Sequence, residues 1–232
     1  MSNAIARRRA AKALRRKAVV SIKRKQAYAE AALSLAERII RATSEPIHCC
    51  LLQEDALLDS GMGTLVLARR VGFDEFVLAA FLIDAYCLGV KDVTLQSVDA
   101  ATLELSLAAM DAVGELIAVD PGYARRLVRE AVAYAQCIGF APYRDYQAAE
   151  RLFGDVGVDT SEAPFAFGRN GKPFYKPGPS ETPTQIRRRL AQLRARLGDG
   201  GFEFVIPVRA DDDIGSHRLD KATDAAPHLE AW

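Results

Sequence analysis

Several features that mark common protein classes are missing from this sequence of 232 residues. It has no apolar run near the roughly 20 residues that a membrane-spanning helix requires, and its basic N-terminus leads into no secretory-type apolar stretch. Four cysteines, none in a CxxC pair, and three histidines exclude a dense disulfide scaffold and the common zinc frameworks. We therefore expect a cytoplasmic protein with no membrane segment, no metal and no cofactor.

The remaining composition is that of a globular protein. Half of the residues are apolar and 26% are charged, which is enough apolar material for a sizeable core. Glycine and proline are too few for a low-complexity chain. The Gly61-Met62-Gly63 segment lacks the Gly-Lys-Ser/Thr ending of a phosphate-binding loop, so we interpret it as a flexible turn.

Charge is distributed unevenly along the chain. The first 25 residues contain ten basic residues and no acidic one, which leaves 21 basic and 30 acidic residues in the other 207. A cationic arm therefore precedes an acidic body, although the net charge of the protein is only +1. The ten cations are Arg7, Arg8, Arg9, Lys12, Arg15, Arg16, Lys17, Lys23, Arg24 and Lys25.

This asymmetry favours binding to a polyanion, RNA or DNA, with RNA as the first choice. The arm is rich in Ala, Arg, Lys and Leu, which predicts a long basic helix, and phosphates would neutralise the repulsion between its cations. Three alternatives remain open at this point. The arm could simply be solvated, it could fold onto the acidic body, or it could bind a protein partner in a larger complex.

Hydrophobic periodicity and turn signals predict an α+β domain over residues 45–208, preceded by a basic helical arm over 1–44 and followed by an acidic flexible tail over 209–232. Strands and helices are segregated, which favours an antiparallel sheet of about five strands with helices packed on it. The predicted strands are 47–52, 64–71, 75–86 and 202–208, with a loop over 53–63 and a connector over 90–97. The predicted helices are 26–43, 100–116, 121–138, 142–154 and 183–197.

The clearest local signal is the Asn170-Gly171 pair, which predicts a type I′ turn in a hairpin over residues 165–176. Cations alternate with aromatic residues there, a pattern that suits base stacking and phosphate contact, although the aromatic residues could instead pack into the core. Arginines on the following helix could extend this surface. The candidate contacts outside the arm are Arg169, Lys172, Arg187 and Arg188.

Carboxylates support an alternative hypothesis, a magnesium-dependent nuclease or phosphoryl hydrolase. Asp84 lies late in an apolar strand, and a buried carboxylate is costly unless it is paired, hydrogen-bonded or bound to a metal. Asp84, Asp92 and Asp155 are the candidate catalytic residues, provided that they converge on one magnesium ion. Otherwise Asp84 faces solvent or pairs with Arg69 or Arg70. Cys87 and His48 could also form a nucleophile pair. The alternative is that the cysteines are small buried thiols with no catalytic role.

Three stretches resemble a bacterial protein family for which no activity is known. They are FLIDAYCLGVKDV (81–93), AVAYAQCIGFAPYRDYQAAERLFGDV (131–156) and FAFGRNGKPFYKPGPSE (165–181). The resemblance indicates a family but implies no activity or mechanism. A fainter similarity is to the ribonuclease H-like fold, which also has early antiparallel strands and a carboxylate cluster. This sequence departs from that pattern because Ile47–Leu52 contains no acidic residue.

Overall fold

A five-stranded sheet forms the centre of the molecule. The computed structural model describes residues 12, 16, 33–158 and 165–205, and within them the strands follow the order β4-β3-β2-β1-β5 with every neighbouring pair antiparallel. The strands are β1 (Ile47–Leu52), β2 (Met62–Arg70), β3 (Phe76–Asp84), β4 (Gly89–Val98) and β5 (Ile117–Ala118). This confirms the predicted α+β class and the antiparallel sheet.

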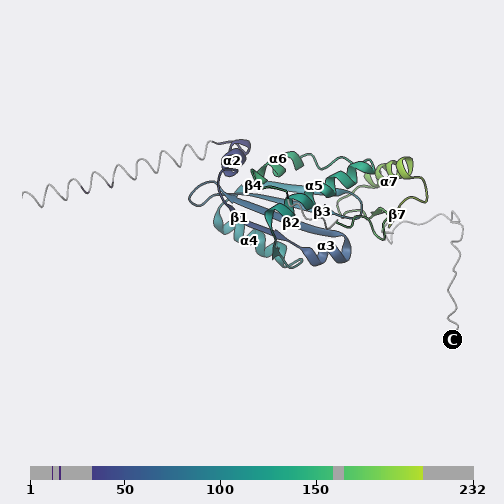
Figure 1. Cartoon of the computed structure of the whole chain (residues 1–232), viewed down its shortest axis with the longest axis horizontal. Coiled ribbons are helices and arrows are strands. Elements are labelled where there is room, and N and C mark those ends of the chain that lie inside the picture. The colour runs from purple at the N-terminus through teal and green to yellow at the C-terminus, as the bar shows by residue number, and fades with distance from the viewer. Residues whose placement is uncertain (1–11, 13–15, 17–32, 159–164, 206–232) are drawn as a thin grey trace, which may run out of the picture.

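Helices cover both faces of the sheet (Figure 1). On one face, α5 packs over side chains such as Leu65 and Phe81, and on the other α4 covers Val66 and Leu78. Burial on both faces explains why the apolar run of β3 shows no alternation. The helices are α2 (Leu35–Ala42), α3 (Glu54–Ser60), α4 (Ala100–Asp111), α5 (Pro121–Cys137), α6 (Tyr146–Glu150), the 3-10 helix η1 (Arg151–Phe153) and α7 (Pro183–Leu197).

Two helix starts follow the predicted capping residues. The Asp120 side chain accepts hydrogen bonds from the backbone N–H groups of Gly122 and Tyr123, and Pro121 occupies the first turn of α5. Thr182 and Gln185 form the capping box that opens α7. Both boundaries were predictable because a few neighbouring residues satisfy the free N–H groups of the first turn.

Two predicted segments were wrong. Residues 90–97, predicted as a connector, form most of β4. The strand contains a bulge, since Leu82 pairs with Asp92 and Ile83 pairs with Val90, which leaves Lys91 without a partner residue on β3. The extra residue breaks the two-residue alternation by which a strand is recognised. The predicted loop over 53–63 contains the short helix α3, which has no side-chain N-cap to announce it.

The C-terminal part of the described chain forms a smaller unit against one end of the sheet. Its core contains Tyr175, Leu193 and Phe202, which pack with Cys87 at the β3–β4 turn and Ile138 at the end of α5. Two short strands, β6 (Phe174–Tyr175) and β7 (Glu203–Phe204), pair in parallel. The predicted strand over 202–208 is therefore present in its first part.

The predicted arm and the predicted tail lie at the two ends of the chain. The predicted basic helix over residues 1–25 lies outside the described residues, apart from Lys12 and Arg16, and so does the predicted tail over 209–232. The helix α2, which the sequence places in the arm, packs into the main core through Ile39 and Ala42. Among the described residues, no helix combines the length and apolarity needed to cross a lipid bilayer.

Candidate nucleic-acid interface

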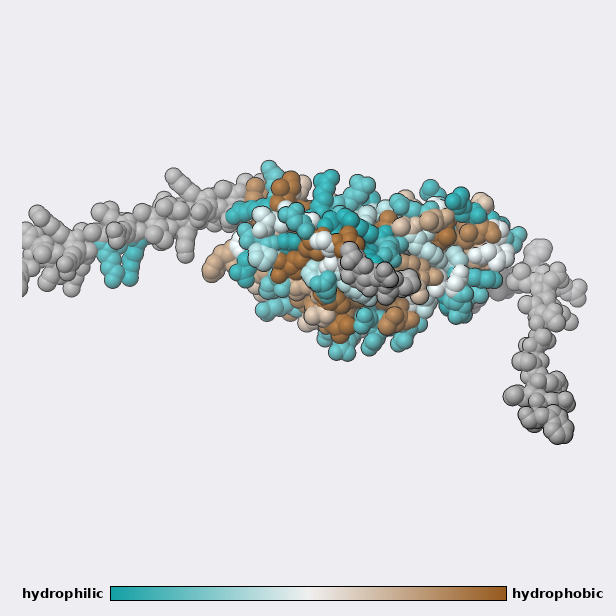
Figure 2. Space-filling model, viewed as in Figure 1, coloured by the Kyte–Doolittle hydropathy of each residue, from teal (hydrophilic) through white to brown (hydrophobic). Residues whose placement is uncertain are grey.

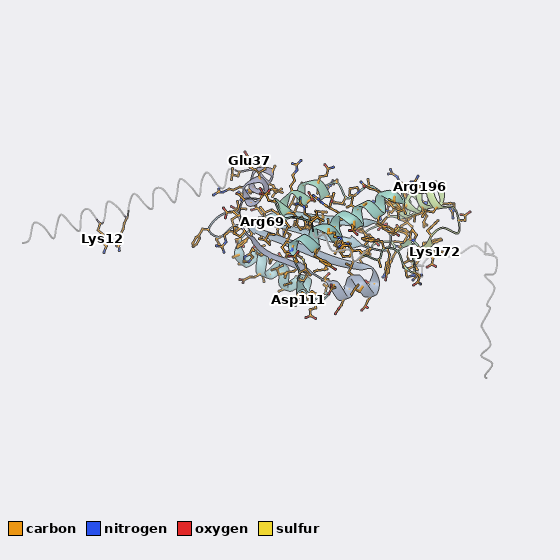
Figure 3. The ribbon with its side chains drawn as sticks, in the orientation of Figure 1. Lys12, Glu37, Arg69, Asp111, Lys172 and Arg196 are labelled. Carbon is orange, nitrogen blue, oxygen red and sulfur yellow. The ribbon has the colours of Figure 1, made fainter. Side chains whose placement is uncertain are left out.

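Charge is divided between two parts of the described chain. Residues 33–158, which contain the whole five-stranded sheet, hold 10 basic and 18 acidic residues, whereas residues 165–205 hold 8 basic and 3 acidic residues. We call residues 165–205 the basic module. Figure 3 shows Lys172 and Arg196 at the end of the molecule where α7 and β7 lie. Residues 33–158 thus have a net charge of −8, and the basic module has a net charge of +5.

The apolar stripe of α7 fixes which of its arginines face outward. Ile186, Leu190, Leu193 and Leu197 recur at helical spacing and pack against Cys87, Leu88, Ala135, Ile138 and Phe140. Arg187 and Arg188 point away from this stripe and are exposed, with no ion-pair partner among the described residues. They are therefore available to a polyanion.

The other cations of α7 have intramolecular roles. Arg196 donates from Nε to the Cys137 carbonyl oxygen at 3.2 Å, and Gln192 donates to the carbonyl oxygen of Gly139. Both groups meet the C-terminal end of α5, where unpaired carbonyls carry partial negative charge. Arg194 pairs with Asp199. The contacts of Arg196 and Gln192 attach α7 to the body of the protein, whereas the Arg194–Asp199 pair lies within the basic module.

Arg189, the third residue of the Arg187–Arg189 run, faces inward. Its guanidinium lies 2.6 Å from Oε2 of Glu181, and the Lys91 ammonium lies 3.2 Å from Oε1 of the same carboxylate. Glu181 also accepts hydrogen bonds from the Tyr175 hydroxyl and from the backbone N–H of Gly178. Burial raises the pKa of Glu181, but these hydrogen bonds and the two cations outweigh it, so the pKa is lowered overall.

The bulge in β4 explains how Lys91 reaches this carboxylate. As the extra residue of the strand, Lys91 leaves the regular pleat and extends toward the basic module. A cavity of about 100 Å³ lies beside it, lined by Lys91, Arg189, Tyr143 and Phe140 among others. Glu181 pairs with both cations of the cavity wall, and its ion pair with Lys91 links the basic module to the sheet.

The Asn170-Gly171 turn forms as predicted. Asn170 has φ 52° and Gly171 φ 77°, and Arg169 and Lys172 form a β-bridge on either side of them. The predicted hairpin goes no further than this single bridge, since Phe174–Tyr175 pairs with β7 instead. The turn presents Lys172 to solvent, while Arg169 lies 3.6 Å from the centre of the Phe174 ring and 2.6 Å from Glu203.

The aromatic residues of this segment are largely used inside the protein. Phe165 and Phe167 pack against Tyr123 and Tyr134 of α5, with ring centres 5.2 Å apart in both pairs, and Tyr175 is fully buried. Of the two alternatives for this segment, base stacking and packing into the core, Tyr175 follows the second. The rings of Phe165 and Phe167 pack against α5 instead of lying free for a base. Among the described residues, four exposed cations of the module have neither an ion pair nor a side-chain hydrogen bond: Lys172, Lys176, Arg187 and Arg188.

The three candidate catalytic carboxylates lie in different surroundings. Asp84 is buried at the end of β3, Asp92 is exposed on β4, and Asp155 is exposed after η1. No group of three or more His, Cys, Asp or Glu side chains within residues 33–158 and 165–205 could hold a metal ion. Asp84, Asp92 and Asp155 therefore do not converge into one metal-binding group.

Asp84 begins the turn between β3 and β4. Its Oδ1 accepts hydrogen bonds from the backbone N–H groups of Tyr86 at 3.1 Å and Cys87 at 2.9 Å, while Oδ2 is buried without a hydrogen-bond partner. Burial raises the pKa of Asp84 to about 6, against the opposing effects of Lys91 and the backbone N–H groups. The carboxylate shapes the turn that carries Cys87 into the core of the basic module.

The proposed partners of Asp84 and Cys87 lie elsewhere. Arg69 pairs with Val77 near the start of β3 and donates to the carbonyl oxygens of Leu152 and Phe153. His48 lies against the Phe76 ring at 4.7 Å, at the opposite end of β3 from Cys87. A strand of this length separates the two by about 26 Å, which excludes a Cys87–His48 nucleophile pair. Burial also raises the pKa of the Cys87 thiol.

The ten cations of the arm lie outside the described residues, except for Lys12 and Arg16, whose side chains are exposed. Sequence reasoning missed Lys91, Glu181 and Arg189 as a unit, because they come from three separate segments. The nearest signal was the run Arg187–Arg189, whose third member lies beside the apolar stripe of α7. Comparison with protein-family models, with curated proteins and with solved structures gave no significant match.

Proposed function

We propose that the protein binds nucleic acid through two cationic elements, residues 1–25 and the exposed face of the basic module, and that RNA is the ligand to test first. The observation that carries the proposal is the segregation of charge. Residues 1–25 contain ten basic and no acidic residues, and the module has a net charge of +5, whereas residues 33–158 have a net charge of −8.

The contacts within the module support this proposal. Its acidic residues, Glu181, Asp199 and Glu203, pair with Arg189, Arg194 and Arg169. Lys172, Lys176, Arg187 and Arg188 are exposed and have no acidic partner among the described residues. Cations without an acidic partner contact phosphates at little cost in free energy, since no existing ion pair must break. Release of counterions from the nucleic acid then drives binding.

The aromatic packing indicates what kind of recognition to expect. Because Tyr175 is buried and Phe165 and Phe167 contact α5, the module offers cations and few free rings. Phosphate contacts position a protein on a nucleic acid without reading its sequence. The proposed binding is therefore strongly dependent on salt and weakly dependent on sequence.

The proposal is tested with the full-length protein and a fluorescently labelled single-stranded RNA. Replacing Arg7, Arg8 and Arg9 by Gln should lower the affinity and reduce the slope of log K against log salt by about 2, because each phosphate that a cation neutralises contributes roughly 0.7 to the slope. A matched triple variant, with Arg70, Arg144 and Arg151 replaced by Gln, removes three cations from the acidic body and should leave the slope unchanged. Equal effects of the two triple variants would overturn the proposal.

A further inference from the structure

The outer face of α4 presents several apolar residues beside its acidic residues Glu104 and Asp111. Leu103, Leu107 and Met110 face the sheet, but the solvent side also presents small and apolar residues at helical spacing: Ala101, Leu105, Ala108 and Ala112. Leu105 is 72% exposed and Val113, just after the helix, is 87% exposed. Exposed apolar residues of this size on a surface helix are typical of a contact site. Brown patches lie along the lower edge of Figure 2, where Figure 1 places α4 and α3.

The same face is acidic and contains no cation. We call residues 53–60 and 98–118 the acidic face; they comprise α3, α4 and the segment that follows, together with flanking residues. It holds seven acidic residues and no basic one, namely Glu54, Asp55, Asp59, Asp99, Glu104, Asp111 and Glu115. Figure 3 shows Asp111 on this edge of the molecule. A segment that covered α4 would therefore need cations beside small apolar residues.

Residues 1–25 of this chain have that composition. They contain ten basic residues, no acidic residue, and alanines, valines and leucine between the cations. The long described segment begins at Leu33, eight residues after this stretch. Arg38 of α2 donates to the Leu33 carbonyl oxygen at 3.0 Å and to the Ser97 hydroxyl at 3.2 Å, and Ser97 lies two residues before Asp99, the N-cap of α4. Leu33, the first residue of the long described segment, therefore lies near the end of β4, the strand that leads into α4.

We infer that residues 1–25 dock on the acidic face of the same molecule when no nucleic acid is bound. The inference rests on the proposed function in one respect: nucleic acid and the acidic face then compete for the same cations. The acidic face acts as an intramolecular mimic of a polyanion, and α4 supplies the apolar contact that a nucleic acid lacks. Docking lowers the affinity for nucleic acid and favours release of weakly bound ligands.

The test is zero-length carbodiimide cross-linking of the full-length protein at low salt, with the linked peptides mapped by mass spectrometry. The lysines of the arm, Lys12, Lys17, Lys23 and Lys25, should cross-link to Glu104, Asp111, Glu115, Asp55 and Asp59. The yield should not depend on protein concentration and should fall when single-stranded RNA is added. Cross-links spread over control acids such as Glu45 and Asp92, or a yield that rises with concentration as in docking between two molecules, would overturn the inference.

Variants separate docking from nucleic-acid binding. Glu104→Lys with Glu115→Lys should remove the remaining cross-links to Asp55, Asp59 and Asp111 and raise RNA affinity about 5-fold or more. The control Glu45→Lys with Asp92→Lys has the same net charge and should change RNA affinity less and keep the cross-links. Leu105→Ser, which changes no charge, should reduce the cross-linking yield if the apolar contact contributes, and an unchanged yield contradicts that part of the inference.

The two proposals fail in different ways. Cross-links are measured without RNA, so their absence overturns the docking inference and leaves RNA binding intact. Persistent cross-links in a protein that does not bind RNA would overturn the proposed function and leave docking intact. RNA affinity that stays unchanged when the cross-links disappear would show that the acidic face does not compete.

Discussion

The Arg189 guanidinium lies 2.6 Å from the Glu181 carboxylate, on the inner side of α7. The other oxygen of that carboxylate lies 3.2 Å from Lys91 on the bulge of β4. This arrangement divides the three consecutive arginines of α7 into two groups. Arg189 pairs with Glu181 inside the basic module, and Lys91 joins that carboxylate to the sheet. Arg187 and Arg188 remain on the exposed surface that we propose contacts nucleic acid.

Replacing Glu181 by Gln should destabilise the protein by about 3 kcal/mol, because Lys91 and Arg189 then share no counter-charge in a largely buried place. Gln keeps one oxygen to accept from the Gly178 N–H, and the Tyr175 hydroxyl, which donates to the other oxygen of Glu181, can accept from the Gln amide instead. The change therefore reports mainly on charge. Urea unfolding measures the change in the free energy of unfolding. The control Glu203→Gln removes an ion pair with Arg169 that is about half exposed, and should cost no more than about 1 kcal/mol. Equal costs would contradict the role assigned to Glu181.

Arg69 offers a test of the main core. Its guanidinium donates to the carbonyl oxygens of Leu152 at 2.7 Å, Phe153 at 2.7 Å and Thr43 at 3.3 Å, so it links β2 to α2 and η1. Lysine keeps the charge but has no planar fork of donors, so Arg69→Lys should cost about 3 kcal/mol in the free energy of unfolding. Arg70→Lys, at an exposed neighbouring position, should change it by less than about 0.5 kcal/mol. A Tm shift in the Arg69 variant no larger than that of the Arg70 variant would refute this account.

The raised pKa of Asp84 predicts that the stability of the protein depends on pH. Burial raises the pKa of its carboxyl from 3.8 to about 6, so the folded state binds this proton more tightly than the unfolded state. The contribution of Asp84 to stability is then fully present below about pH 4 and is lost as pH rises through about 6. Asp84→Asn keeps the oxygen that accepts from Tyr86 and Cys87 and should remove this fall in stability. Denaturant unfolding from pH 4 to 7 measures it.

The matched control for that experiment is Asp92→Asn, which removes an exposed carboxylate from the next strand. It should retain the fall in stability between pH 4 and 6. Identical pH profiles for wild type and Asp84→Asn would show that Asp84 does not titrate in this range in the folded protein.

Much of the fold could be predicted from local signals. The strand Ile47–Leu52, the start of α5 at Asp120-Pro121 and the capping box of α7 all depend on a few adjacent residues, and each lies where it was predicted. The helix predicted over 100–116 ends instead at Asp111, whose Oδ1 accepts from the Leu116 N–H and closes a turn. That contact depends on the following segment folding back to pair β5 with β1.

The candidate site was harder to predict, because it depends on contacts between distant segments. Lys91 comes near Glu181 only through the bulge in β4, and the burial of Tyr175 depends on its place between α7 and the β3–β4 turn. The acidic face could not be predicted from local sequence either. Its seven acids come from two segments that the sheet brings together, as the hydrogen bonds from Gln53 Nε2 to the carbonyl oxygens of Met110 at 2.8 Å and Gly114 at 3.0 Å show.

The exposed pair on α7 gives a direct prediction for binding. Arg187→Gln with Arg188→Gln should weaken RNA binding and reduce the salt slope by about 1.4, at roughly 0.7 for each phosphate contact. Arg169→Gln with Arg194→Gln removes two cations of the same module that already pair with Glu203 and Asp199, and should have a smaller effect. Fluorescence anisotropy at several salt concentrations compares the two. A larger decrease in affinity for the Arg169 and Arg194 variant would contradict the assignment of Arg187 and Arg188 to the interface.

The most direct test of nucleic-acid binding is the affinity of the full-length protein for a single-stranded RNA, measured from about 50 mM to about 200 mM salt. We expect log K to fall linearly with log salt with a slope of about −4 or steeper, which corresponds to six or more phosphate contacts. Binding that does not respond to salt, or no binding at the lowest salt concentration, would contradict the central claim.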